Sequence, residues 1–117
     1  MYKDSLGRFL TLCLFQENYE HQNKKYPAVY SLRDPDPNNP NQLPSFKKLF
    51  MDTRDITGYK VAMQELGSWE HMQKLFKSKW FMAHFVKWVD EMEVMLKAEG
   101  LLKIQEHSLG EGSTSFQ

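Results

Sequence analysis

The stretch that decides the fold is residues 79–96, KWFMAHFVKWVDEMEVML. Large apolar side chains recur in it at alternating steps of four and three, at Phe81, Phe85, Trp88, Met92 and Met95. This spacing is typical of a helix whose apolar seam faces another helix. It predicts a long amphipathic helix over residues 79–106, about 42 Å in length. Because such a helix is longer than a domain of this size needs, we expect these five side chains to form an oligomer interface.

The residues before this helix, 45–78, carry three shorter helical patterns. Ser45 and Ser68 each precede apolar residues at helical spacing, which is where N-caps are expected. Thr57 is in the corresponding place for a middle helix, and Gly67 supplies a left-handed stop at its end. Three short helices separated by tight breaks are compatible with a helix-turn-helix unit. The chain is therefore predicted to be all-α, with short, helix-turn-helix-like helices followed by one long amphipathic helix.

Residues 1–44 combine a short apolar run with a Pro- and Asn-rich loop. The spacing of the apolar run favours a short helix, although the run could also form a strand; the residues on the shared face are Leu6, Phe9, Leu10 and Cys13. Residues 33–44 contain four of the five prolines, which exclude regular structure there. We expect an ordered loop that is anchored by Tyr30 and Leu32.

The C-terminal residues 107–117, HSLGEGSTSFQ, are rich in Gly and Ser. This composition predicts a flexible tail. Gly100 weakens a helix by roughly 1 kcal/mol relative to Ala. A bend or an earlier end at Gly100 is therefore the alternative to an uninterrupted long helix.

Length, charge and cysteine usage limit the classes of protein that fit. A chain of 117 residues suits one domain. The 15 basic and 15 acidic residues cancel, so no global field attracts nucleic acid or membrane. Residues 60–87 nevertheless carry five Lys against two Glu (5 − 2 = +3), and residues 88–117 carry two Lys against six acids (2 − 6 = −4). The single cysteine excludes an internal disulfide and suits a reducing cytoplasm, and the apolar run at 6–15 is too short for a membrane span.

None of the sequence signatures of catalysis is present. The four histidines lack the paired spacing of a zinc site, and Cys13 lies in an apolar run where a thiol is usually inert. There is no G-x-S-x-G nucleophile motif and no glycine-rich phosphate loop. We therefore expect a non-enzymatic protein that requires neither a metal nor a cofactor.

Nucleic-acid contact is the chemistry that the sequence favours most. Basic side chains at helix ends and turns suit contacts to phosphates. The candidate DNA-binding residues are Arg54, Lys60, Lys74, Lys77 and Lys79. The alternative is that these are ordinary surface cations and that the chain is a small helical protein-interaction module, an adaptor or inhibitor that captures its partner through the Phe81–Met95 face without binding DNA.

Several segments together resemble one family. The segments are residues 43–51 (LPSFKKLFM), 57–62 (TGYKVA), 68–75 (SWEHMQKL), 80–81 (WF), 88–101 (WVDEMEVMLKAEGL) and 115–117 (SFQ). They resemble the small terminase subunits of tailed bacteriophages. In that family a similar Ser-Phe-Gln opens a further helix, so the resemblance implies a chain truncated after Gln117 or one that lacks this element.

The resemblance implies a function and partners. Small terminases are non-catalytic subunits that recognise DNA, regulate packaging and assemble as rings. The implied partners are double-stranded viral DNA, further copies of the chain, and a large terminase subunit that carries the ATPase and nuclease. The implied location is the cytoplasm of the bacterial host cell. Residues 45–78 would be the DNA-binding unit and residues 79–106 the oligomerisation helix.

Overall fold

The computed structural model describes the main chain of residues 2–111 and the side chains of residues 2–100. Two 3-10 turns, η1 (Leu12–Leu14) and η2 (Tyr19–His21), precede the helices. The helices are α1 (Phe46–Thr53), α2 (Tyr59–Val61), which continues as the π-helical segment η3 (Ala62–Leu66), α3 (Trp69–Phe76) and α4 (Lys79–Glu111). Within the described chain the only β-type pairings are isolated bridges. The predicted all-α fold is therefore confirmed.

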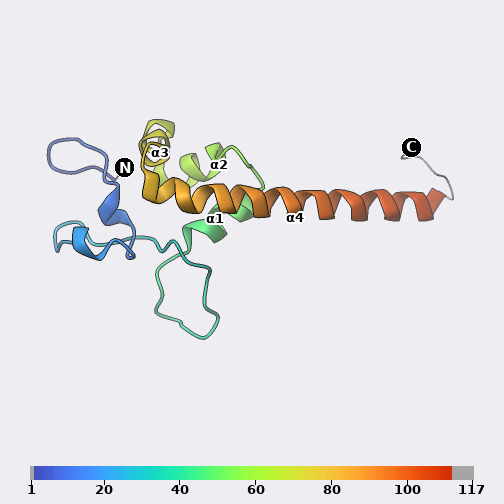
Figure 1. The fold of residues 1–117 in the computed structure, drawn as a ribbon, viewed down its shortest axis with the longest axis horizontal. Coiled ribbons are helices and arrows are strands. Elements are labelled where there is room, and N and C mark those ends of the chain that lie inside the picture. The colour runs from blue at the N-terminus through green and yellow to red at the C-terminus, as the bar shows by residue number, and fades with distance from the viewer. Residues whose placement is uncertain (1, 112–117) are drawn as a thin grey trace.

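Helix α4 is the axis of the molecule, and the other elements gather around its N-terminal half (Figure 1). The protein measures 62 × 34 × 22 Å, and the C-terminal part of α4 extends beyond the remaining helices (Figure 1). The helix passes through Gly100 and ends at Glu111, beyond the predicted end at residue 106. The prediction of a flexible tail is therefore wrong for residues 107–111, which are helical, while residues 112–117 lie outside the described residues.

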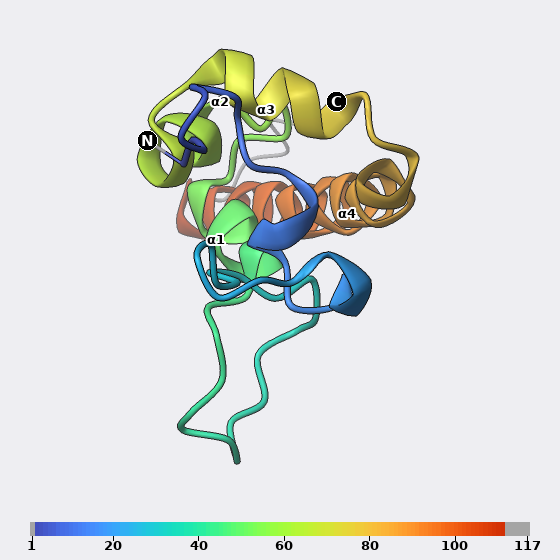
Figure 2. The ribbon, with the colours of Figure 1, turned by 90° about the vertical axis from the view of Figure 1, so that its left-hand side faces the viewer.

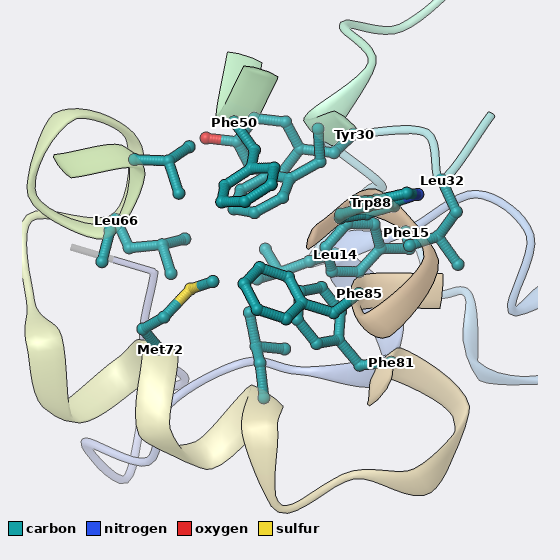
Figure 3. Packing of buried hydrophobic residues seen from close by; sticks show 14 of the residues in the cluster. Leu14, Phe15, Tyr30, Leu32, Phe50, Leu66, Met72, Phe81, Phe85 and Trp88 are labelled. Carbon is teal, nitrogen blue, oxygen red and sulfur yellow. The ribbon is translucent and has the colours of Figure 1, made fainter. Parts of the chain in front are cut away.

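The seam of α4 is covered by the chain itself (Figure 3). Phe81, Phe85, Trp88 and Met92 are buried in one core with side chains from α1, η3, α3 and the N-terminal segment, and Met95 is half-buried at the edge of that core. The ring of Phe50 on α1 lies 4.9 Å from that of Phe85, between centroids. The prediction that this seam forms an oligomer interface, or captures a partner, is wrong for the four buried residues. The short helices fold back over the seam and leave these four side chains almost no exposed surface.

The ends of the short helices largely follow the sequence. The Lys48 N–H donates to Ser45 Oγ (3.2 Å), and the His71 N–H donates to Ser68 Oγ (3.1 Å), so both predicted N-caps are confirmed. Gly67 ends η3 with a left-handed φ of 69°, also as predicted.

The middle helix is closed differently from the prediction. Its N-cap is Gly58, with no side-chain cap, and the Asp55 carboxylate closes the turn by accepting hydrogen bonds from the Thr57 N–H (3.1 Å) and the Lys60 N–H (2.9 Å). Thr57 contributes through its hydroxyl, which accepts from the Tyr59 N–H (3.2 Å). Burial alone would raise the pKa of Asp55, but these hydrogen bonds outweigh it and lower that pKa.

The N-terminal apolar run does not form the expected helix. Lys3 and Phe9 form an antiparallel bridge around a tight turn, and a 3-10 turn at Leu12–Leu14 follows. The positive φ of Gly7 (79°) breaks a helix at the start of the run. The hydrogen bond of the Leu10 N–H to the Tyr2 carbonyl (2.9 Å) closes the turn instead.

The Pro-rich loop is anchored as expected, because Tyr30 and Leu32 are buried. The Glu17 carboxylate accepts from the Ser31 hydroxyl (2.7 Å) and from the Leu32 N–H (2.8 Å). Burial would raise the pKa of Glu17, but these hydrogen bonds more than offset it, so the carboxylate stays ionised and holds the base of the loop.

Candidate nucleic-acid interface

The candidate interface is built on two short helices joined by a tight turn. Helix α2 and η3 form the first helix, Gly67 and Ser68 form the turn, and α3 is the second helix. The Gly67 N–H donates to the Ala62 carbonyl (2.8 Å), an i→i+5 bond that widens the last turn of the first helix. The left-handed Gly67 and the cap at Ser68 then allow the chain to start α3 at once.

Helix α3 has one buried face and one exposed face. His71, Met72 and Leu75 are buried in the core. The opposite face is a stripe of exposed side chains at i, i+3, i+4 and i+7, which we call the α3 stripe: Glu70, Gln73, Lys74 and Lys77. The stripe carries two positive charges and one negative charge, and it offers amide, ammonium and carboxylate groups to a partner.

His71 holds α3 against the N-terminal segment. Its Nε2 contacts the Leu10 carbonyl, and because a carbonyl only accepts, the ring proton lies on Nε2. Its ring stacks on Phe9 with centroids 4.7 Å apart. Burial lowers the pKa of His71 more than the hydrogen bond to Leu10 raises it, so this side chain is neutral. In the described part of the chain, His71 Nδ1 is a buried nitrogen without a hydrogen-bond partner. The His71 side chain therefore has a structural role, in which it links α3 to the N-terminal segment.

The structure brings three of the five predicted DNA-binding residues close together. Lys74 and Lys77 lie one turn apart on the α3 stripe, and Lys79 is exposed at the start of α4, immediately after α3. Lys60 is exposed on α2, in the first of the two short helices. These four cations therefore belong to the two short helices, the residue that follows them and the start of α4.

Arg54 lies elsewhere. It ends α1 in the left-handed conformation (φ 55°), and its guanidinium binds the Glu99 carboxylate through Nε (3.2 Å) and Nη2 (3.1 Å). Glu99 is about 30 Å along α4 from Lys79 at the helical rise per residue. Arg54 therefore links α1 to α4 and is paired with a carboxylate, and its assignment as a DNA-binding residue stays a prediction.

Sequence reasoning missed Gln73 and Glu70 as members of the exposed stripe. The signal was available, because both fall at helical spacing from Lys74 and Lys77 and opposite the apolar residues of α3. Neither side chain carries a positive charge, so neither has the sequence signal of a phosphate contact.

The described residues offer little support for other kinds of site. No group of three or more His, Cys, Asp or Glu side chains within them is placed to hold a metal ion. Within the described residues, none of the helices is both long enough and apolar enough to cross a membrane. Comparison with protein-family models, with curated proteins and with solved structures gave no match.

Proposed function

We propose that this chain is a non-catalytic subunit that recognises double-stranded DNA through α3 and acts as a homo-oligomer in viral genome packaging, in the manner of a small terminase. The observation that carries the proposal is the α3 stripe: the second helix of a helix-turn-helix buries one face and exposes Gln73, Lys74 and Lys77 on the other. In helix-turn-helix proteins the second helix enters the major groove.

The chemistry of the stripe suits that groove. An α-helix with its side chains is about 10–12 Å in diameter, so α3 fits the width of the major groove, about 12 Å. Gln pairs with adenine edges and Lys with guanine edges, so Gln73 and Lys74 supply groups that read bases. Lys77 and Lys79, at the end of α3 and the start of α4, supply charges for the phosphates that flank the groove.

Assembly would compensate for the weak charge of a single chain. The formal net charge is zero, so one copy makes few phosphate contacts, whereas several linked copies multiply them. The part of α4 that projects beyond the core gives the chain a surface for a second copy (Figure 1). The packaging role, the viral DNA and the large terminase subunit as partner rest on the resemblance of the sequence segments to small terminases.

Binding to a fluorescein-labelled 30-bp duplex across a range of salt concentrations tests the proposal. Lys74→Glu with Lys77→Glu removes one base contact and one phosphate contact per chain, so the affinity should fall and the slope of log K against log salt should fall by about 0.9 per chain. The matched control is Lys87→Glu with Lys97→Glu, two exposed lysines on α4 with the same change in charge. The control should bind like the wild type, and light scattering should give a mass above 13.9 kDa for all three proteins.

Two results would contradict the proposal. Equal loss of binding in both double variants would mean that only net charge matters and that α3 is not the contact surface. If the wild-type chain is monomeric and does not bind the duplex even at low salt, DNA recognition is excluded.

A second candidate function is a protein-interaction module. Tyr59 and Met63 lie one turn apart on the α2–η3 helix and are both exposed, with Ile56 just before them. Apolar side chains gathered in this way are typical of a contact surface for another protein. If this is the function, Tyr59→Ser with Met63→Ser abolishes partner capture, and both lysine double variants leave it unchanged.

A further inference from the structure

The N-terminal turn lies beside the proposed recognition helix, and its geometry is closely defined (Figure 2). The Asp4 carboxylate accepts from the Leu6 and Arg8 N–H groups (both 2.9 Å) and from Arg8 Nε (2.8 Å). The Asp4 N–H donates to the Arg8 carbonyl (2.9 Å), and Gly7 takes the positive φ that the turn needs. The turn therefore presents Arg8 from a fixed backbone.

The turn is also fixed relative to α3. Phe9 directly follows Arg8 and stacks on the buried ring of His71, whose Nε2 donates to the Leu10 carbonyl. The ammonium of Lys3 lies 4.7 Å from the centroid of the Phe9 ring on the other strand of the turn. Because His71 belongs to α3, any partner that contacts the outer face of α3 meets the turn in a constant position.

A groove of about 520 Å³ separates the turn from α3. Arg8 lines it from the turn and Lys74 from α3, with the hydroxyl residues Thr11 and Ser78, and with Glu70 as the one acid on its walls; Gly7 and Phe9 complete the lining. The charged side chains that line the groove therefore sum to +1. The N–H of Arg8 Nε donates to the Asp4 carboxylate. The other four N–H donors of the guanidinium are on its two Nη nitrogens. Two cations and two hydroxyls are the groups that proteins use to bind phosphodiester oxygens.

The groove and the α3 stripe are continuous, because Glu70 and Lys74 belong to both. We propose that this groove, with Arg8 as its principal residue, binds a backbone phosphate of the same duplex that α3 reads, so that the N-terminal turn is a second DNA-contacting element. The inference rests on the proposed function. A ligand that lies along α3 passes over the groove, whereas a small free anion gains nothing from this continuity.

Arg8→Ala tests the inference, and Arg33→Ala is its matched control. The two arginines are almost equally exposed (73% and 71% of the side chain), and each pairs with one carboxylate, Asp4 or Glu17. Removing one phosphate contact should lower the salt slope for the 30-bp duplex by about 0.9 and the affinity about fivefold at 0.15 M salt. Arg33→Ala should bind like the wild type. Arg8→Lys, which keeps the charge, should restore the slope.

The outcomes separate this inference from the proposed function. Suppose that the wild type binds the duplex, that Lys74→Glu with Lys77→Glu does not, and that Arg8→Ala binds with the same affinity as Arg33→Ala. The turn then does not contact DNA, and only this inference is refuted. If the wild type does not bind, both fall. If inorganic phosphate at constant ionic strength binds the wild type but not Arg8→Ala, and does so without changing the affinity for DNA, the groove is a site for the free anion and the inference is overturned.

Discussion

Gly58→Ala should destabilise the protein by about 2–4 kcal/mol. Gly58 is buried at the start of α2 with a φ of 81°, a conformation that costs a residue with a Cβ about 1–2 kcal/mol. A Cβ there would lie 3.3 Å from Cζ of Phe76 and of Phe85 and 3.4 Å from Cε of Met72, so these side chains must shift. Crowding of a packed core costs about 1–3 kcal/mol, and the small shifts needed here place the cost toward the lower end.

Thermal and urea unfolding measure this change. For a chain of this length about 4 °C of Tm corresponds to 1 kcal/mol, so Tm should fall by about 8–16 °C. Gly100→Ala is the control, because Gly100 is helical and a Cβ there meets no described atom within 4 Å. It should stabilise the protein by about 0.5–1 kcal/mol. If Gly58→Ala were as stable as the wild type, the packing of the α2 start against α3 and α4 would be refuted.

Two further predictions concern the buried His71 and the half-buried Lys47. Burial lowers the pKa of His71 below its ordinary value of 6.5, so in acid the unfolded chain binds more protons than the folded chain. The free energy of unfolding should therefore fall as the pH drops below about 6.5. The contribution of this residue is at most about 1.4 kcal/mol per pH unit. Urea unfolding between pH 5 and 8 measures this dependence of stability on pH. His71→Phe should remove it, whereas His84→Gln, at an exposed position, should keep it. If the dependence persists in His71→Phe, it comes from other groups. Lys47 is 16% exposed and bridges Asp34 (2.8 Å) and Glu91 (2.7 Å), whereas the neighbouring Lys48 is 56% exposed and pairs only with Asp52 among the salt bridges of the described residues. Lys47→Ala should therefore cost about 1 kcal/mol or more and Lys48→Ala less than about 0.5 kcal/mol, and equal costs would mean that the Lys47 bridge is not formed in solution.

Local signals predicted the helical part of the fold well. Ser45 and Ser68 as caps and Gly67 as a stop depend only on neighbouring residues, and the structure confirms all three. The position of the long helix depended on a repeat of apolar side chains, which is also local. Its end could not be placed, because Gly100 is tolerated inside a helix at a small cost in stability.

Tertiary placement was the part that the sequence could not supply. A heptad-like seam has the same pattern whether its own chain or another chain covers it, so the burial of Phe81 and Trp88 in the chain's own core was not predictable from spacing. Likewise, nothing in the sequence shows that Arg54 pairs with Glu99 or that Arg8 lies beside Lys74. These are contacts between distant segments, and the N-terminal turn that supplies Arg8 was itself expected to be helical.

The measurement that tests the central proposal most directly is a titration of the isotopically labelled protein with the 30-bp duplex, followed by backbone amide chemical shifts. We expect the largest shifts at Gln73, Lys74 and Lys77, with residues 87–97 of α4 unchanged at the same ratio of DNA to protein. Shifts confined to Tyr59 and Met63, or no shifts at low salt, would contradict the proposal that α3 is the surface that recognises DNA.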